Sequence, residues 1–258
     1  MIDSHCHLDF PQFDEDRDDV LSRAIDAGVT AVVNPGTDLE SSRRAVALAE
    51  RYDNVYAAVG VHPHDASTLD EQTLSELRQL AIHTKVVAIG EIGLDYYRDL
   101  SPRAEQRTAF EAQLTLAADL DLPVIIHQRE SGADVMDALR GWAGEGHPGC
   151  VLHAFSGDRA MADEAILLGF YIGVGGPLTF KNARRLPEIV PDVALSSVVV
   201  ETDAPYLAPH PYRGKRNEPA HMVLVAERLA QLRGLSLDEL AKQVTESTLR
   251  LFRLPSAS

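Results

Sequence analysis

Short apolar runs alternate with longer amphipathic stretches along the whole chain. The runs are rich in Val and Ile, and most are about five to eight residues long, which is typical of buried strands and short for helices. Eight such runs can be delimited: Met1–Leu8, Val29–Pro35, Val55–His62, Val86–Leu94, Pro123–His127, Cys150–Phe155, Phe170–Gly175 and Val198–Asp203.

The stretches between the runs have the spacing of amphipathic helices. In the stretch 103–121, Phe110, Leu114 and Ala117 fall at positions i, i+4 and i+7. These positions share one face of a helix, so they form an apolar stripe that would pack on a sheet.

Two helix starts can be predicted from local chemistry. Ser101 and Pro102 offer an N-cap followed by proline at the first helical position. Ser236 and Glu239 have the spacing of a capping box before a further helix near the C-terminus.

Eight strand-then-helix units without a Pro/Gly/Ser-rich linker predict one domain over residues 1–258. A (β/α)₈ barrel, the TIM-like α/β architecture, takes about 250 residues and fits this length. A doubly wound open sheet is the alternative. It usually has fewer strands and would carry a G-x-G-x-x-G turn after the first strand, which is absent here.

Composition limits the kinds of partner and the location expected for the protein. The chain has 24 Lys+Arg against 39 Asp+Glu, a formal net charge of −15. This charge argues at first against a polyanionic partner, since phosphate binders usually carry a basic footprint. No run approaches the roughly 20 apolar residues of a membrane span, and the first residues lack the features of a secretory signal. With only two cysteines, we expect a reducing cytoplasmic location and no membrane partner.

Polar residues stand where five of the predicted strands end. In a (β/α)₈ barrel the functional site lies at the carboxyl ends of the strands. The first run ends in two histidines, and the fourth, fifth, sixth and eighth runs each end in a histidine or a carboxylate. These candidate metal ligands are His5, His7, Glu91, His127, His153 and Asp203.

The spacing of the first pair is informative. Side chains two apart on a strand point the same way, so His5 and His7 can both face the barrel mouth while Cys6 faces the helices. The six donors are too many for one tetrahedral ion with an open position. Two ions about 3.5–4 Å apart that share a carboxylate account for them better.

Each candidate ligand taken alone has a more ordinary explanation. A single histidine after an apolar run is more often structural, and Glu91 alone could cap a helix or form a salt bridge. Taken jointly, four of the ten histidines fall at the ends of three runs, with carboxylates at two others. This coincidence favours metal binding, because buried polar groups need partners.

Further polar residues surround the predicted mouth. His62 closes the third run and could contact substrate or orient a ligand, and a plain loop histidine is equally consistent with its position. Arg129 follows His127 by two residues and is balanced between anion binding and pairing with a carboxylate. Glu201 shares the predicted face of Asp203 one layer deeper, where a supporting role beside the metals is expected.

One basic segment opposes the overall acidity. Arg213, Lys215 and Arg216 place three positive charges within four residues of the eighth loop. Such a run is usually a solvated loop. Its position beside the proposed metals, at a face where barrel enzymes often bind phosphate, favours substrate binding by these three residues.

Longer blocks of sequence carry a family resemblance that runs through nearly the whole chain. They are Ile2–Asp9, Gly60–His64, Gly90–Tyr97, Leu122–His127, His153–Gly157, Thr179–Asn182, Glu201–Pro209 and Arg213–Pro219. With these blocks the chain resembles the TatD family of metal-dependent deoxyribonucleases. It departs from the family pattern at Glu130, Ala154 and Ala204, where Asp, Cys and Ser are usual. None of these departures removes a proposed ligand, but they leave substrate preference open.

The resemblance implies a TIM-like barrel with two divalent metal ions. His5 and His7 would bind one ion together with Asp203, and Glu91 would bridge to a second ion bound by His127 and His153. It implies hydrolysis of phosphodiester bonds in DNA, as an exonuclease, by a water that the metals activate. Glu91 and Asp203 are the expected catalytic residues, and Asp203 could accept the proton of the water.

The resemblance also implies a short or single-stranded DNA segment at the mouth of a monomer or weak oligomer. Mg²⁺ or Mn²⁺ is expected in activity, with Zn²⁺ or Fe²⁺ as possible occupants. The two ions would supply about +4 at the mouth, which reconciles the net acidity with a nucleic-acid substrate. The alternatives are a D-aminoacyl-tRNA deacylase, a hydrolase of the amidohydrolase or phosphotriesterase kind, and a barrel without catalysis.

Overall fold

The computed structural model describes residues 1–144 and 146–255. Its eight strands are all parallel and are arranged in chain order from β1 to β8. The strands are β1 (Ile2–Asp3), β2 (Ala31–Pro35), β3 (Val55–Val59), β4 (Val86–Asp95), β5 (Val124–Arg129), β6 (Cys150–Leu152), β7 (Tyr171–Val174) and β8 (Val198–Val200).

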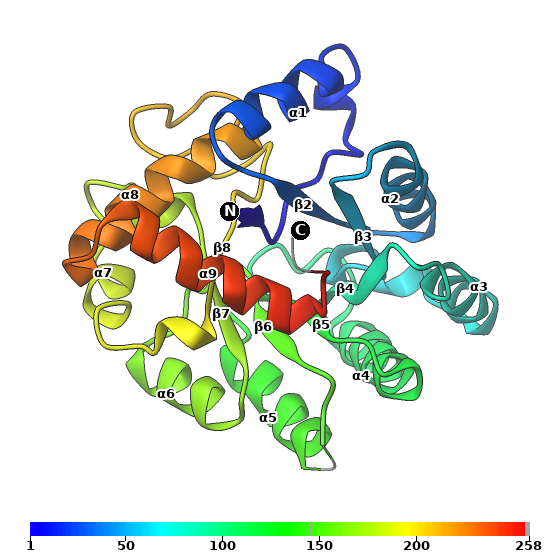
Figure 1. The fold of residues 1–258 in the computed structure, drawn as a ribbon. Helices are drawn as coiled ribbons and strands as arrows, with labels where there is room; N and C mark the ends of the chain where they lie inside the picture. Colours follow the sequence, from blue (N-terminus) through cyan, green and yellow to red (C-terminus); the bar gives the residue numbers. More distant parts are fainter. Residues whose placement is uncertain (145, 256–258) are drawn as a thin grey trace.

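Helices surround this ring of strands on the outside, except for the last helix, which lies across the ring (Figure 1). They are α1 (Arg17–Asp26), α2 (Leu39–Arg51), α3 (Glu71–Ala81), α4 (Arg103–Leu120), α5 (Gly132–Ala143), α6 (Arg159–Leu167), α7 (Arg185–Ile189), α8 (Met222–Arg233) and α9 (Leu237–Phe252). One helix follows each strand, and α9 is additional. The predicted TIM-like (β/α)₈ architecture is confirmed.

Backbone contacts between the two ends of the sheet close the ring. The Ser4 N–H donates to the Val200 carbonyl at 3.2 Å, and Cys6 and Ala204 form a parallel bridge beyond the regular strands. The His7 N–H donates to the Ala204 carbonyl at 2.8 Å. The segment that carries His5 and His7 is therefore fixed against the segment that follows β8.

The last helix closes the amino-terminal end of the barrel. In Figure 1, α9 crosses the middle of the ring of strands. Leu251, Phe252 and Leu254 belong to one buried apolar cluster with residues of seven strands. The strand residues are Ile2, Val33, Ala58, Ala88, Ile125, Val151 and Val199. Because this end is covered, the carboxyl ends of the strands form the mouth.

Several local predictions can now be compared with the structure. Phe110, Leu114 and Ala117 are buried on α4, and the capping box of Ser236 is present. The N-cap predicted at Ser101 is wrong. Pro102 occupies that position, and the Ser101 hydroxyl instead donates to the His64 carbonyl at 2.8 Å.

Most strands are shorter than their apolar runs, and three of them are very short. β1, β6 and β8 have two or three residues each, so the polar residues at the ends of these runs lie in the following segments. The runs are longer because these segments remain buried beyond the last ladder hydrogen bonds.

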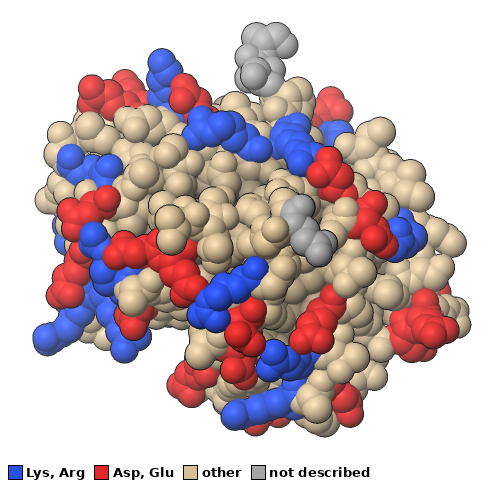
Figure 2. All heavy atoms as spheres, turned by 90° about the horizontal axis from the view of Figure 1, so that it is seen from below, with Lys and Arg blue, Asp and Glu red and all other residues tan. Residues whose placement is uncertain are grey.

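The outer surface carries both signs of charge. On the side shown in Figure 2, Lys and Arg side chains are interspersed with Asp and Glu. Among the described residues, no helix combines the length and hydrophobicity needed to cross a bilayer.

Candidate metal centre

Six side chains converge at the mouth from five of the eight strands or the segments that follow them. Glu91 lies within β4 and His127 within β5, whereas the other four residues follow β1, β6 and β8. They come together because the carboxyl ends of parallel strands in a closed barrel meet at one rim. The six residues are His5, His7, Glu91, His127, His153 and Asp203, and their atoms form overlapping groups suited to metal ions.

Glu91 lies at the centre of the site and is only 3% exposed. Its Oε2 atom lies 3.4 Å from His5 Nε2 and 3.6 Å from His7 Nε2. Its Oε1 atom lies 2.8 Å from His127 Nδ1 and 3.3 Å from His153 Nε2. The two oxygens of one carboxylate thus face two different groups of ligands, which is the arrangement of a bridging residue between two ions.

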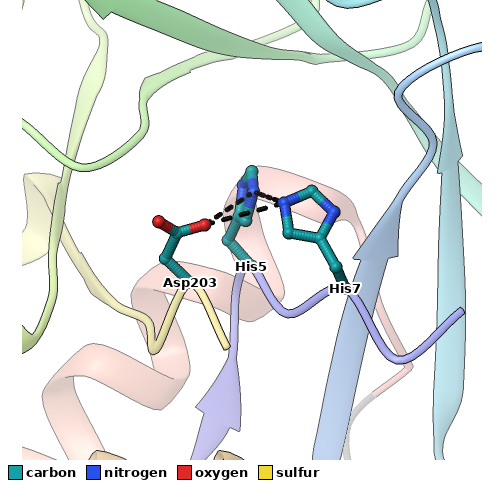
Figure 3. A group of neighbouring side chains, drawn as sticks. All are labelled: His5, His7 and Asp203. Atoms are coloured by element: carbon teal, nitrogen blue, oxygen red, sulfur yellow. Dashed lines mark hydrogen bonds and ion pairs between the residues drawn. The ribbon is translucent and has the colours of Figure 1, made fainter. Parts of the chain in front are cut away.

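The first group consists of His5, His7 and Asp203 (Figure 3). The two histidine Nε2 atoms are 3.1 Å apart, and Asp203 Oδ1 lies 3.7 and 3.6 Å from them. Asp203 has a positive φ of 56°, and its N–H donates to the His5 carbonyl at 2.9 Å. This left-handed backbone is rare for a residue other than glycine, and it is typical of functional sites.

The donor chemistry fits a divalent cation. Nδ1 of His5 and of His7 is buried without a hydrogen-bond partner among the described residues, and Nδ1 of His153 faces only Glu201. Their Nε2 atoms converge with buried carboxylate oxygens at the centre of the site. Buried polar atoms are normally satisfied, and imidazole and carboxylate groups together suit Zn²⁺, Mn²⁺ and Fe²⁺.

Electrostatic interactions with the histidines keep the carboxylates ionised. Burial alone would raise the pKa of Glu91, but His153, His5 and His62 hold that pKa well below its usual range. Burial likewise opposes ionisation of Asp203, and the hydrogen bond with His7 nevertheless lowers its pKa. The carboxylates therefore require nearby positive charge, which a divalent ion can supply in place of imidazole protons.

His153 is held from behind by Glu201. The Nδ1 atom of His153 lies 3.2 Å from Glu201 Oε1, and the N–H of Ala154 donates to the same oxygen. Burial favours the neutral imidazole, but the charges of Glu201 and Glu91 raise the pKa of His153 to about 10. A carboxylate behind a histidine fixes the direction of the ring, as expected of a supporting residue.

His62 lies closer to the centre than its loop position suggests. Its Nε2 atom is 3.6 Å from Glu91 Oε1, and it forms a third group with Glu91 and His127. Its Nδ1 accepts the His64 N–H at 3.1 Å, so neutral His62 carries its proton on Nε2. Burial and the charge of His127 lower the pKa of His62 well below its usual value. His62 thus presents an N–H donor to the mouth.

Sequence reasoning missed Asp95 and His64 as members of the site. Asp95 Oδ2 lies 3.0 Å from His127 Nε2 and 3.0 Å from His64 Nε2. Asp95 therefore orients the ring whose other nitrogen faces Glu91. The strand rule applied to His5 and His7 would have found it, because Glu91, Gly93 and Asp95 alternate along β4.

The predicted basic residues have different surroundings. The Arg129 guanidinium lies 3.9 Å from the centroid of the Tyr97 ring, and Arg213 lies 4.3 Å from that of Phe180. Lys215 lies 5.9 Å from the Tyr212 ring centroid. None of the three has a carboxylate partner among the described residues.

Arg216 differs from these three residues. It donates to both carboxylate oxygens of Asp16, at 2.7 and 2.6 Å, and to the Gln12 carbonyl. Its charge is therefore engaged by Asp16 in the segment before α1.

The fold and the site together define a class: barrel hydrolases with buried histidines and carboxylates suited to a binuclear metal site at the mouth. Within that class the chain belongs to the TatD family, since the model described as "TatD related DNase" matches residues 2–253.

Individual relatives are similar to this chain over nearly its full length. An uncharacterized metal-dependent hydrolase, YabD, of Bacillus subtilis is 42% identical, with 98% of this chain and 99% of the relative covered. The 3'-5' ssDNA/RNA exonuclease TatD of Shigella flexneri is 39% identical, with 98% of each chain covered. The crystal structure of the Escherichia coli TatD homologue YJJV has a TM-score of 0.93 and 37% identity, covering 99% of this chain and 98% of that one.

These comparisons confirm the family and the enzyme class predicted from the sequence, a metal-dependent hydrolase acting on ester bonds. The roles of the individual residues remain predictions.

Proposed function

We propose that this protein hydrolyses phosphodiester bonds of single-stranded DNA as a 3'-5' exonuclease that uses two divalent cations. The observation that carries the proposal is the position of Glu91, whose two carboxylate oxygens face two separate groups of ligands. The name of the Shigella relative, a 3'-5' ssDNA/RNA exonuclease, supports the substrate class and polarity.

Each ion has its own set of proposed ligands. His5, His7 and Asp203, which form one group suited to an ion, would hold one cation. His127 and His153, which both face Glu91 Oε1, would hold the other, with Glu91 bridging. When bound, the cations would polarise the phosphoryl oxygens and make a water molecule more acidic. Mg²⁺ or Mn²⁺ fits phosphodiester hydrolysis, and the donor set also accommodates Zn²⁺ or Fe²⁺.

The side chains of the protein complete the reaction. The ionised carboxylate of Asp203 accepts a proton from the attacking water, whose oxygen forms a bond to phosphorus. The bond between phosphorus and the leaving sugar oxygen breaks, and that oxygen takes up a proton from solvent water. His62 Nε2–H donates a hydrogen bond at the mouth, where a phosphoryl oxygen would lie. We propose that Arg129, Arg213 and Lys215, which have no carboxylate partner among the described residues, contact flanking phosphates.

The test is cleavage of a labelled single-stranded oligonucleotide by Glu91→Gln and Asp203→Asn variants with Mg²⁺ or Mn²⁺. We expect the rate of each to fall by at least about 10³-fold, since even supporting residues of metal sites cost about 10–100-fold. Metal titration should show fewer than two ions on Glu91→Gln. Glu111→Gln changes an exposed glutamate of α4 and serves as the matched control.

Three results would contradict the proposal. Full metal-dependent cleavage by both variants would exclude these residues from the reaction. Deacylation of D-aminoacyl-tRNA without strand scission would favour the deacylase, and hydrolysis of only C–N bonds, lactones or triesters would favour the amidohydrolase or phosphotriesterase kind.

A further inference from the structure

A cavity of about 370 Å³ opens beside the metal centre, between the segments that follow β6 and β7. We call it the Phe180 pocket. Ala154, Ser156, Gly175, Phe180, Arg184 and Arg185 are among the residues that line it. Its volume lies within the range of small-molecule sites, about 300–1,000 Å³. None of these residues belongs to the proposed metal centre.

Phe180 gives the wall of the Phe180 pocket a flat surface for stacking, and Arg213, which does not itself line the cavity, lies against this ring. Phe180 is half-buried, and the Arg213 guanidinium lies 4.3 Å from its ring centroid. Arg213 comes from the segment after β8, and its Nη1 lies 3.5 Å from Asn182 Oδ1. Aromatic rings and guanidinium planes are the groups on which single-stranded bases stack, without preference for a particular base.

The rim of the Phe180 pocket carries unpaired positive charge. Arg184, Arg185 and Arg213 are exposed. Within residues 1–144 and 146–255, no carboxylate forms an ion pair with any of them. Arginines of the outer helices behave differently: Arg140 pairs with Glu164, and Arg159 with Asp163. Unpaired arginines around a flat-walled cavity, in a chain of net charge −15, indicate an anionic ligand with a planar part.

The Phe180 pocket adjoins the metal centre through the backbone. Ala154, in its wall, directly follows His153. A Cβ atom on Gly175, also in the wall, would lie 3.4 Å from the Glu201 carbonyl oxygen and 3.5 Å from its Cγ. Glu201 in turn supports His153. A nucleotide whose base enters this pocket therefore has its phosphates beside His153.

We infer that the Phe180 pocket receives one unpaired base of the nucleic-acid strand next to the bond being cleaved, with the flanking phosphates against Arg184, Arg185 and Arg213. This inference rests on the proposed function and adds to it a reason for single-strand selectivity. A base within a duplex is stacked and paired, and it would have to leave the helix to enter the pocket.

The first experiment measures the kinetics of the Phe180→Ala variant on two substrates. On a single-stranded oligonucleotide, KM should rise about 10-fold, because stacking on an aromatic side chain corresponds to about 5- to 150-fold per base. On bis(p-nitrophenyl) phosphate, a small diester without a base, kcat/KM should stay within about twofold. Phe180→Trp keeps a stacking surface and should keep the KM for DNA near that of the wild type. An unchanged KM for DNA, or an equal loss on both substrates, would overturn the inference.

Binding of a fluorescent oligonucleotide, followed by anisotropy, separates this inference from the proposed function. A wild-type protein that binds the strand through Phe180 but does not cleave DNA contradicts the function and supports the pocket. Equal affinity of the wild type and Phe180→Ala contradicts the pocket.

The same binding experiment also tests the arginines at the rim, through the salt dependence of binding. For Arg185→Gln, the slope of log K against log salt concentration should become shallower by about 0.7, the value for one lost phosphate contact on a single strand. Arg228→Gln is the matched control, since Arg228 hydrogen-bonds Gln231 on α8. An unchanged slope for Arg185→Gln would remove Arg185 from the site.

Discussion

The two ends of the barrel are built from the same strands and have opposite chemistry. At the amino-terminal end, Leu251, Phe252 and Leu254 bury apolar surface against seven strands. At the carboxyl end, buried histidines and carboxylates surround Glu91. Burial of apolar surface at the closed end stabilises the fold. Burial of ionisable groups at the mouth has a large desolvation cost and depends on partners of opposite charge.

This difference indicates how the molecule separates stability from chemistry. Among the described residues, the buried cluster at the closed end consists of apolar side chains, so a change there acts on the fold as a whole. The mouth contains groups whose charges depend on one another, so a change there alters metal affinity and reaction rate first. Substitutions at the closed end should therefore change the free energy of unfolding, whereas substitutions at the mouth should change metal affinity and reaction rate.

The largest effect on folding is expected for Phe252→Ala at the closed end. Phe252 is 3% exposed within the apolar cluster, and truncation of a buried phenylalanine costs about 3–5 kcal/mol. Urea denaturation in the presence of a chelator should show this loss of unfolding free energy, while kcat of the folded fraction stays unchanged. Leu167→Ala, at an exposed position of α6, should leave the unfolding free energy unchanged within about 0.5 kcal/mol. If fully folded Phe252→Ala had a reduced kcat, the closed end would also affect the reaction, and stability and chemistry would not be separated between the two ends.

Glu201→Gln should lower metal affinity or activity at the mouth, while the apolar packing at the closed end stays unchanged. Glu201 Oε1 lies 3.2 Å from His153 Nδ1, and loss of a supporting group costs about 10–100-fold in metal affinity or activity. The pKa of His153, now about 10, should fall because the charge of Glu201 raises it. Titration of the imidazole resonances in metal-free protein measures this shift. An unaltered His153 pKa would show that Glu201 does not act through this ring.

How far the sequence predicts the molecule differs between its parts. The alternation of apolar runs and amphipathic stretches was enough for the barrel, because each strand-then-helix unit is a local pattern. The set of candidate ligands followed from the barrel, since all of them stand at the ends of apolar runs, and their binding of metal remains a prediction. The position of α9 across the amino-terminal end could not be predicted, because Phe252 and Leu254 reach the strands only through tertiary packing.

The contacts of individual side chains could be predicted less well from the sequence. Asp95 could have been found by strand alternation, but its contact with His64 depends on the path of a neighbouring loop. The pairing of Arg216 with Asp16 joins residues 200 positions apart. The sequence shows three basic residues in one segment, and only the fold reveals that two of them lack a carboxylate partner within residues 1–144 and 146–255.

The mouth should also respond to pH with a predictable sign. Without metal, the pKa of His153 is raised from 6.5 to about 10, since the charges of Glu201 and Glu91 outweigh burial. Protonated His153 therefore stabilises the metal-free fold fully below about pH 6.5, and this contribution is lost as the pH rises towards 10. Metal binding has the opposite dependence, because the imidazole must lose its proton.

Calorimetric titration with Mn²⁺ should therefore show affinity rising from pH 6 to 8, by up to about tenfold per unit for each proton released. The unfolding free energy of metal-free protein should fall over the same range. Affinity that does not change with pH would contradict the proposed role of His153 as a ligand.

The smallest effect is expected for Arg216→Ala, which distinguishes the basic residues at the mouth from one another. Arg216 is held by Asp16, whose pKa falls to about 2 chiefly through this hydrogen bond. Such partly exposed pairs contribute at most about 1 kcal/mol. We expect KM for single-stranded DNA to change less than twofold in Arg216→Ala, and to rise severalfold in Arg213→Ala, because Arg213 has no carboxylate partner within the described residues. If Arg216→Ala raised KM as much as Arg213→Ala, the charge of Arg216 would reach the substrate despite its pairing, and the basic segment would act as one unit.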